Sequence, residues 1–351
     1  MAYGPRLRFG EVLLIGVIGL GLIGGSILRG VAARGAGNGH GGGGEVIGFD
    51  ADPEVRAAAR SEGFNVADSW QEVVDASELV FLATPIADTV DLIGEIANLG
   101  ASAPVLTDVS SVKRPVVHAA NEAGLKQFVG GHPMAGSHRA RWAAADEGLL
   151  RGAVWALVLD EQTDSGAWAN VAETVLGLGA RIAPVSAVAH DRAVAAVSHA
   201  AHVASAAYAN SIEAVAPMPL SLVLAAGSFR DVTRVMLSPE ERTAAMLIEN
   251  GDDTAAVASV MSEEVSALAK ALSARDEGVV AKQLASAGDL RRRYDRLIAT
   301  EAMTGRLIDA PTRAELVDEL RGLVDSGALV ADITDVMNDG AIWRAAVLSP
   351  V

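Results

Sequence analysis

The chain has 351 residues, 50% of them hydrophobic and 21% charged, which supplies enough apolar material for folded cores and suggests two domains. Its formal net charge of -16 argues against nucleic acid and anionic membranes as partners, because both surfaces are themselves negative. The sequence contains no cysteine, which excludes disulfides, thiolate metal ligands and a cysteine nucleophile, and we expect no metal site.

An uncharged apolar segment near the N-terminus, residues 12–28, follows two arginines as the core of a signal peptide would. It is shorter than the roughly 20 residues that a membrane-spanning helix needs, several glycines interrupt it, and no convincing cleavage site follows it. We therefore expect a cytoplasmic protein that does not enter a membrane.

Short apolar runs alternate with longer amphipathic stretches between residues 13 and 184, a pattern typical of a parallel sheet covered by helices. The runs that we interpret as strands of this sheet are residues 13–18, 46–49, 79–83, 105–107, 128–130 and 154–159. Residues 35–44 are glycine-rich and predict a flexible excursion between the first helix and the second strand, without a chemical role.

A glycine motif, Gly19-Leu20-Gly21-Leu22-Ile23-Gly24, directly follows the first predicted strand and opens a helical pattern. In this context the first glycine permits a tight turn, the second lets the backbone approach a pyrophosphate, and the third lets helix and strand pack closely. The pyrophosphate would lie at the N-terminus of the helix. We predict a Rossmann-like dinucleotide-binding domain whose cofactor contacts Gly19, Gly21, Leu22, Ile23 and Gly24. The alternative is a structural turn that binds no nucleotide.

Asp50 ends the second predicted strand, where its carboxylate would hold a ribose 2′-hydroxyl and repel a 2′-phosphate. It lies farther from the glycine motif than the usual ~20 residues, and the glycine-rich insertion accounts for the excess. The sequence therefore favours NAD over NADP as the cofactor, although Asp52 or Arg56 could alter this preference. Thr84-Pro85, after the third strand, is assigned to the same cofactor site.

After residue 184 the strand signals stop, and alanine, valine and leucine recur at helical spacing over residues 187–214, from 220, and over 254–272 and 279–299. These helices carry more apolar surface than one small helical domain can bury, which predicts an intertwined homodimer. From residue 311 the pattern predicts one helix, 312–325, and one strand, 328–333, with no assigned chemistry. We therefore divide the chain into an α/β dinucleotide-binding domain (12–184), an all-α substrate and dimerisation domain (185–300) and a C-terminal tail (301–351).

Two polar segments each follow a predicted strand: Asp108-Val109-Ser110-Ser111-Val112-Lys113 and Gly131-His132-Pro133-Met134-Ala135-Gly136-Ser137. Ligands of open α/β sheets bind at the carboxyl ends of the strands. Both segments are therefore expected within reach of a nicotinamide ring.

Five motifs, in order and spacing, resemble those of prephenate/arogenate dehydrogenases over residues 13–272. They are the glycine motif, the two polar segments, His190-Asp191 with Val197-Ser198-His199-Ala200-Ala201-His202, and Phe229-Arg230-Asp231-Val232-Thr233-Arg234 with Glu249-Asn250. The resemblance implies NAD-dependent oxidative decarboxylation of prephenate to 4-hydroxyphenylpyruvate, in tyrosine biosynthesis. The substrate has a ring carboxylate and a side-chain carboxylate, and its C4 hydrogen leaves as hydride. The alternative substrate is arogenate, which would give tyrosine directly.

The resemblance assigns the general base to His132, and an imidazole with a pKa of about 6.5 suits that task at neutral pH. It places the Ser111 hydroxyl against the substrate hydroxyl. The alternatives are a histidine that packs a turn and a serine that caps a helix. Because Ser110 stands where the family usually has a smaller or different residue, either serine could point inward.

Ser198 and His202 lie four residues apart and would share one face of a regular helix with Asp191, whereas His199 faces elsewhere and is interpreted as structural. The resemblance implies that Ser198, His202 and Arg234 bind the substrate, the arginine as a bidentate clamp for a carboxylate. Two alanines replace the family's Leu-Pro before the second histidine. This predicts a straighter helix and could shift His202, so a buried structural histidine is the alternative.

Two positions depart from the family: His138 and Thr243 stand where a glutamate and a tryptophan are common. An imidazole in place of a carboxylate favours the keto acid prephenate over the amino acid arogenate. A β-hydroxyacid dehydrogenase is a less favoured interpretation, because such enzymes use a lysine base on the first helix of the second domain, where this chain has histidines and no lysine. A non-enzymatic NAD sensor or dimerisation module would lack the base, serine and arginine found here.

Overall fold

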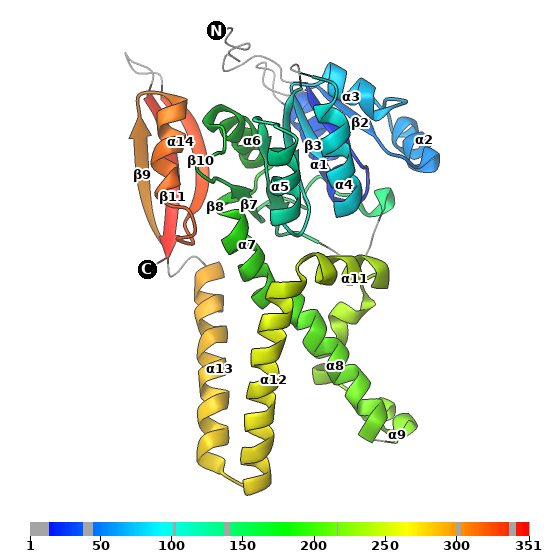
Figure 1. Ribbon diagram of the computed structural model, residues 1–351, viewed down its shortest axis with the longest axis vertical. Helices are drawn as coiled ribbons and strands as arrows, with labels where there is room; N and C mark the ends of the chain where they lie inside the picture. Colours follow the sequence, from blue (N-terminus) through cyan, green and yellow to red (C-terminus); the bar gives the residue numbers. More distant parts are fainter. Residues whose placement is uncertain are drawn as a thin grey trace. The chain divides into compact units, whose positions relative to one another are not determined.

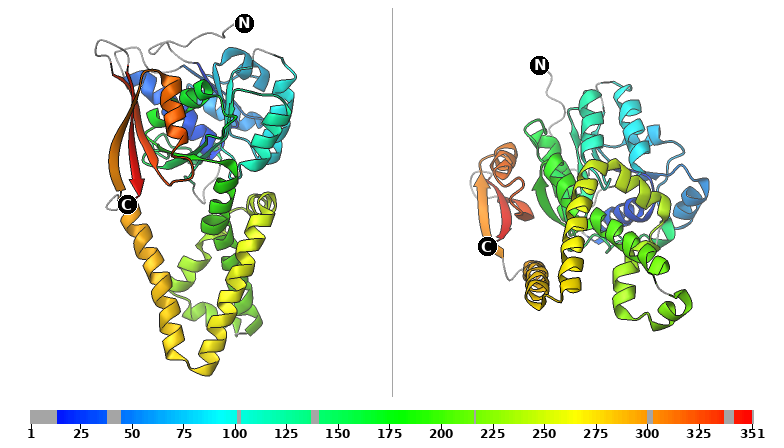
Figure 2. Two further views of the ribbon diagram at one scale, coloured as in Figure 1. Left: turned by 60° about the vertical axis from the view of Figure 1, so that its left-hand side comes forward. Right: turned by 60° about the horizontal axis from the view of Figure 1, so that its bottom comes forward.

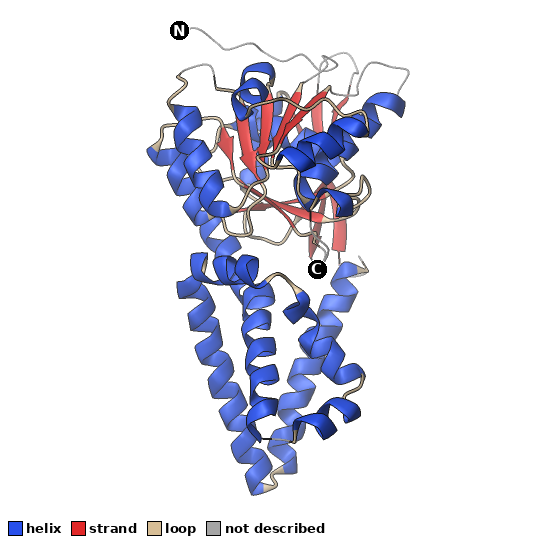
Figure 3. Ribbon diagram, turned by 90° about the vertical axis from the view of Figure 1, so that its right-hand side faces the viewer, coloured by secondary structure: helices blue, strands red, loops and turns tan. Residues whose placement is uncertain are grey.

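The computed structural model describes residues 14–37, 45–100, 103–136, 141–215, 217–299, 303–336 and 342–350. The chain divides into two compact units, one made of Met1–Val188 with Arg306–Leu348 and one of Ala189–Gly305 with Ser349–Val351. Figure 1 gives the elements in chain order, and Figure 3 separates helices from strands by colour. The predicted order, an α/β unit followed by a helical unit, is confirmed. In the described part of the chain, no helix combines the length and apolar character of a transmembrane segment.

The first sheet consists of five parallel strands in the order β2-β1-β3-β4-β5. They are β1 (Ile15–Ile18), β2 (Val46–Phe49), β3 (Leu79–Leu82), β4 (Val105–Asp108) and β5 (Phe128–Val129). All residues of β1, β3 and β4 are buried, as expected for short strands that helices cover on both faces. The strand order reverses between β1 and β3, and ligands of such sheets bind at the carboxyl ends beside this point.

Helices follow the strands of this sheet along the chain. They are α1 (Leu22–Gly37), α2 (Pro53–Ser61), α3 (Trp70–Ala76), α4 (Ile86–Ala97) and α5 (Arg114–Glu122). Local signals start two of them: the Asp52 carboxylate accepts from the Glu54 amide at the start of α2, and the Ser69 hydroxyl accepts from the Glu72 amide at the start of α3. These helices begin where their sequence caps them.

A second sheet in the same unit has six strands in the order β6-β7-β8-β10-β11-β9. Its N-terminal members are β6 (Gly131–Pro133), β7 (Val154–Val158) and β8 (Arg181–Val185), with the 3-10 turn η1 (Trp142–Ala144) and helix α6 (Ser165–Gly177) between them. The prediction that residues 154–159 form a sixth strand of the first sheet is wrong, because β7 pairs with β6 and β8 instead. The chain changes sheets at Gly130, between β5 and β6, where an added Cβ would come within 3.0 Å of the Val117 and Val158 side chains.

The C-terminal segment extends this second sheet. It contributes β9 (Met303–Ala310), α14 (Arg313–Arg321), β10 (Leu329–Val336) and β11 (Ile342–Pro350), whereas the sequence pattern predicted one helix and one strand. β10 runs antiparallel to β8. The Arg321 guanidinium donates to the Asp160 carbonyl and, at 2.6 Å, to the Thr163 carbonyl, and Arg313 pairs with Glu173 at 2.7 Å. Strand pairing and polar contacts thus join the described part of this segment to the rest of the first unit.

Between Ala189 and Ala299, the described residues of the second unit form helices and the turns between them. Its elements are α7 (Ala187–Val194), a π-helical turn η2 (Ala195–His199), α8 (Ala200–Val215), α9 (Met218–Leu224), α10 (Gly227–Thr233), a 3-10 turn η3 (Arg234–Leu237), α11 (Glu240–Glu249), α12 (Gly251–Ala274) and α13 (Glu277–Ile298). Figure 2 shows α12 and α13 as a long helical hairpin. Large apolar side chains are exposed on this unit, among them Val197 (78%), Val215 (83%) and Ile248 (79%).

Candidate active site

The glycine motif forms the turn between β1 and α1. Gly19 has a φ of 93°, and its amide donates a 2.8 Å hydrogen bond to the Phe49 carbonyl. A Cβ at Gly19 would come within 2.5 Å of the Ala83 carbonyl oxygen, and one at Gly24 within 1.8 Å of the Gly19 carbonyl oxygen. A Cβ at Gly21 would meet no atom within 4 Å. Two glycines are therefore required by the turn and its packing, and the third leaves open space through which a ligand can approach the backbone.

The other predicted cofactor residues of the loops lie beside this turn. Leu22 and Ile23 begin α1, and both side chains pack into the protein, so these residues offer a ligand their backbone. Amides in the first turn of a helix lack intrahelical acceptors and suit a phosphate. Thr84 follows the alanine that contacts Gly19, its hydroxyl lies 2.8 Å from the Thr89 hydroxyl, and Pro85 precedes α4.

Asp50 follows β2 and is bound to the glycine loop. Its Oδ2 accepts from the Leu20 amide at 2.7 Å, and its Oδ1 accepts from the Asp52 amide at 2.8 Å. The Arg56 guanidinium donates to the Asp50 and Ala51 carbonyls at 2.7 and 3.0 Å. The carboxylate is thus held at the end of β2, while the neighbouring arginine is engaged by the backbone. This arrangement disfavours a 2′-phosphate at the same place.

A buried ion pair joins the two polar loops that follow β4 and β5. Lys113 and Asp108 are fully buried, and the lysine ammonium pairs with the Asp108 carboxylate and donates to the Gly131 carbonyl at 2.6 Å. The other Asp108 oxygen accepts from the Gly131 amide at 2.9 Å. Gly131 is therefore held through both its carbonyl and its amide, directly before His132. The sequence motifs contained both charged residues but assigned them no role.

Ser111 and His132 belong to the loops that this ion pair joins. Ser111 is half-buried just before α5, and His132 is half-buried in β6. Ser110 is buried, its amide donates to the Asp108 carboxylate at 2.9 Å, and its hydroxyl has no hydrogen-bond partner among the described residues. Of the two serines, Ser111 is therefore the more accessible to a substrate. His138 lies outside the described residues.

The three predicted substrate-binding residues lie in the second unit. Ser198 is exposed in η2, His202 is half-buried in the first turn of α8, and Arg234 is exposed at the start of η3. The Nδ1 atom of His202 is buried and has no hydrogen-bond partner within the described ranges. Burial lowers the pKa of His202, and the positive charges of Arg242 and then Arg234 lower it further. A neutral imidazole near two guanidinium groups is a suitable environment for an anionic substrate group.

The helix that carries Ser198 and His202 is not regular. It continues through the two alanines, as predicted, but the π-helical turn Ala195–His199 precedes them. One extra residue in a turn rotates the following residues by about 100° relative to a regular α-helix. Asp191 is accordingly fully buried whereas Ser198 is exposed, so the prediction that they share one face is wrong. Thr243 is half-buried in α11, and its hydroxyl donates to the Pro239 carbonyl at 3.1 Å.

Four buried polar residues form a network at this π turn: His190 and Asp191 before it, His199 at its end, and Asn250. The His190 Nδ1 lies 2.8 Å from the Asp191 Oδ1, and the Asn250 amide donates to the Asp191 carbonyl at 2.7 Å. The same amide nitrogen lies 3.1 Å from the Nδ1 of His199. Burial is the largest cause that lowers the pKa of His199 to about 4; Asp191 opposes it, and His190 and His202 add to it. The sequence motifs contained these residues without revealing that they form one network.

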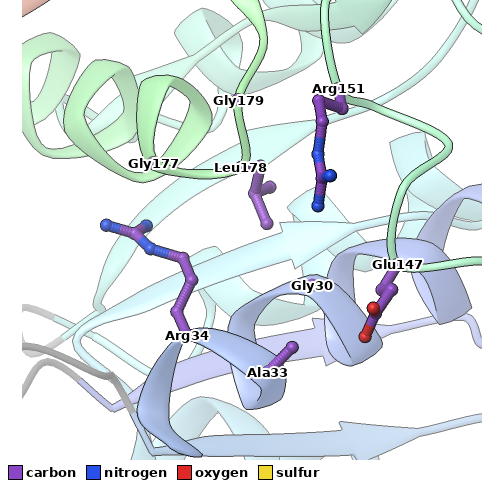
Figure 4. Close-up of a pocket in the computed structure, with 8 residues that line it drawn as sticks. All are labelled: Gly30, Ala33, Arg34, Glu147, Arg151, Gly177, Leu178 and Gly179. Atoms are coloured by element: carbon purple, nitrogen blue, oxygen red, sulfur yellow. The ribbon is translucent and has the colours of Figure 1, made fainter. Parts of the chain in front are cut away.

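A pocket of about 230 Å³ in the first unit contains none of the predicted site residues. Figure 4 shows it at the ends of α1 and α6, lined by Gly30, Ala33, Arg34, Glu147, Arg151, Gly177, Leu178 and Gly179. Arg34 packs so closely against Gly177 that a Cβ there would come within 1.7 Å of its guanidinium, and burial lowers the pKa of this arginine. Helix C-termini favour cations, so packing at two helix ends accounts for Arg34. The described residues contain no group of acidic or histidine side chains that could hold a metal.

Comparison with known proteins gives two family models that match this chain. One, described as the nucleotide-binding domain of prephenate dehydrogenase, matches residues 36–184, and the other, described as its dimerization domain, matches residues 186–286. The first match begins after the glycine motif. The evidence for the cofactor loop is therefore the geometry of its glycines.

Individual relatives are also prephenate or arogenate dehydrogenases by name. The prephenate dehydrogenase of Bacillus subtilis (strain 168) is 33% identical over 240 residues, which cover 67% of this chain and 63% of that protein, so the chain spans less than two thirds of this relative. The prephenate dehydrogenase from A. aeolicus in complex with hydroxyphenyl propionate and NAD+ superimposes with a TM-score of 0.73 at 22% identity, covering 81% of this chain and 99% of that one. Synechocystis arogenate dehydrogenase superimposes with a TM-score of 0.70 at 25% identity, covering 80% of this chain and 100% of that one.

Proposed function

The chain belongs to the prephenate dehydrogenase family, and we propose that it converts prephenate to 4-hydroxyphenylpyruvate and carbon dioxide with NAD as the oxidant. The observation that carries this proposal is the buried Asp108–Lys113 pair, which joins the loops of Ser111 and His132 at the edge of the nucleotide-binding sheet. Oxidation of an alcohol needs a base and a hydrogen-bonding group beside the cofactor. These two loops supply both.

The glycine loop and Asp50 hold the cofactor. Gly21 and the first turn of α1 would hold its pyrophosphate, and the Asp50 carboxylate would bind the adenosine ribose. When bound, NAD accepts the hydride from the substrate. The A. aeolicus relative, which carries NAD+ in its solved complex, supports the choice of NAD.

His132 acts as the general base. Its imidazole accepts the proton of the substrate's 4-hydroxyl as the C4 hydrogen leaves as hydride, and Ser111 hydrogen-bonds the same hydroxyl oxygen. Loss of the ring carboxylate then gives an aromatic phenol, so decarboxylation needs little further assistance. The half-buried position of both residues on adjoining loops supports these roles.

Arg234, His202 and Ser198 bind the acidic groups of the substrate. A guanidinium matches a carboxylate in fork geometry. Burial, and after it the positive charges of Arg242 and Arg234, lower the pKa of His202, and an anionic group bound there would meet these two charges. The substrate carries two carboxylates. Arg242, whose charge also acts on His202, adds to the positive charge of this part of the helical unit.

Arogenate is the second candidate substrate, favoured by the structural likeness to Synechocystis arogenate dehydrogenase. The two substrates differ in the side chain, which is a keto acid in prephenate and an amino acid in arogenate. The arginines near His202 favour the side chain without an ammonium group. We therefore propose prephenate as the preferred substrate.

The protein acts as a homodimer in the cytoplasm. The match to a dimerization domain and the exposed apolar side chains of the helical unit support the dimer. Light scattering should give twice the monomer mass of 36.0 kDa at micromolar concentration. A monomer would contradict this part of the proposal.

The test is an assay of the purified protein with NAD and either prephenate or arogenate. We expect NADH to form with prephenate, 4-hydroxyphenylpyruvate to be the product, and NADP to be a poorer oxidant than NAD. Faster turnover of arogenate would make arogenate, and not prephenate, the preferred substrate. Absence of NADH with both would refute the proposed function.

A further inference from the structure

Asn250 connects two points of the chain that flank the π-helical turn η2. It lies between α11 and α12 and is fully buried. Its side-chain amide donates to the carbonyl of Asp191, which precedes the turn, and lies 3.1 Å from the Nδ1 of His199, the last residue of the turn. One side chain thus contacts the helix before the turn, at Asp191, and the last residue of the turn, His199.

The contact with His199 has a defined polarity. An amide NH₂ group can only donate, so the His199 Nδ1 must accept and the ring proton must reside on Nε2. A proton on Nδ1 would break this contact. The pKa of about 4 agrees with a neutral ring, held so by burial and by His190 and His202 against the opposing charge of Asp191.

A π turn is uncommon and recurs at functional sites. If η2 relaxed to a regular α-helix, the residues after it would rotate by about 100° relative to Asp191. His202 lies three residues beyond the turn, and Ser198 lies within it. The direction of both side chains therefore depends on whether the turn persists.

We propose that Asn250 is a positioning residue that maintains the π turn and so directs Ser198 and His202 toward the substrate. This inference rests on the substrate-binding role proposed above for the helical unit. Asn250 acts through these two residues and does not itself touch the substrate.

The test compares Asn250→Ala and Asn250→Asp with Thr254→Val as the matched control. Thr254 lies one turn further along α12, and its buried hydroxyl has no partner among the described residues, so its loss should change kcat and KM less than twofold. Asn250→Ala should lower kcat/KM for prephenate by about 10- to 100-fold, mostly through KM, because misplaced binding groups weaken catalysis to this extent. Asn250→Asp places a carboxylate against the His199 Nδ1 and should raise the pKa of that histidine by about 1 to 3 units.

Histidine ring resonances in NMR spectra give a readout that does not depend on activity. In both Asn250 variants the His202 resonance should shift, whereas Thr254→Val should leave it in place. A folded Asn250→Ala protein with unchanged KM and an unmoved His202 resonance would overturn the proposal, even if its melting temperature fell. If Asn250→Ala does not fold, the KM and the His202 resonance of Asn250→Asp decide whether the proposal holds. If the wild-type protein produced no NADH from prephenate, the proposed function would fail while the His202 resonance still decided the role of Asn250.

Discussion

Replacing Lys113 by methionine tests the buried ion pair that joins the two polar loops. Lys113 and Asp108 are both fully buried, so Lys113→Met leaves a carboxylate without its countercharge inside the protein. Breaking a buried pair from one side typically costs about 3 to 5 kcal/mol of the free energy of unfolding. For a unit of this size, 1 kcal/mol corresponds to about 2 to 4 °C, so the melting temperature should fall by roughly 6 to 20 °C.

The double variant Asp108→Asn with Lys113→Met distinguishes a lost charge partner from lost packing. A neutral amide no longer needs the ammonium, so the double variant should be more stable than Lys113→Met alone. The recovery should be partial, because the amide NH₂ replaces one of the two oxygens that accept from the Ser110 and Gly131 backbone amides. Lys126→Met is the control, because Lys126 is exposed and its replacement should change stability by less than about 0.5 kcal/mol. Urea unfolding measures the free energy of unfolding of the single variant, the double variant and the control. A loss below 1 kcal/mol in Lys113→Met, or a double variant no more stable than the single one, would refute the reasoning.

Four further predictions concern single side chains. His132→Asn should lower kcat for prephenate by roughly 10²- to 10⁴-fold with a much smaller change in KM, and a near-normal kcat would remove this histidine from the mechanism. Arg234→Ala should raise KM about 10- to 100-fold, since a charge-assisted hydrogen bond contributes about 1.5 to 3 kcal/mol, and Arg234→Lys should recover only part of that loss in steady-state assays. Arg242→Gln should raise the pKa of His202 in an NMR titration, because the arginine's positive charge lowers that pKa. An unchanged pKa would show that Arg242 does not act on His202. The pKa of His199 is about 4 in the folded protein and about 6.5 in the unfolded chain, so the unfolded chain binds the proton first as the pH falls. The stability that depends on the neutral His199 is therefore complete above pH ~6.5 and is lost as the pH falls through about 4, and urea unfolding of His199→Gln should show a flatter pH dependence.

Features that depend on neighbours in the sequence were predictable. The strand, the glycines and the following helix of the cofactor loop come from one short segment, and Gly19 and Gly24 lie where the motif requires them. The five strands of the first sheet are apolar runs bounded by polar residues, which is sufficient to recognise a buried parallel strand. The motif resemblance predicted the family correctly. The resemblance named candidate site residues but did not predict how they are arranged in space.

The second sheet shows where local patterns fail. An apolar run such as Val154–Val158 predicts a strand but not its partner, and β7 joined a different sheet because the chain turned at Gly130. The strands β9 and β11 were not predicted at all. Most of β9 is exposed, so its sequence lacks the clear alternation that marks a half-buried strand.

The sequence by itself determined the fold class and the turn of the glycine motif, because each depends on residue type and short spacing. The family resemblance named the candidate catalytic residues. Only the tertiary structure decided how these residues are held. The Lys113 ammonium reaches Gly131, 18 positions away, and Asn250 reaches Asp191, 59 positions away. The residues from Asp191 to His202 do not by themselves reveal the π turn. Asn250, distant in the sequence, contacts the helix before the turn and the last residue of the turn. The free energy that selects such a geometry comes from buried polar groups that must find partners, and those partners are set by packing rather than by local sequence.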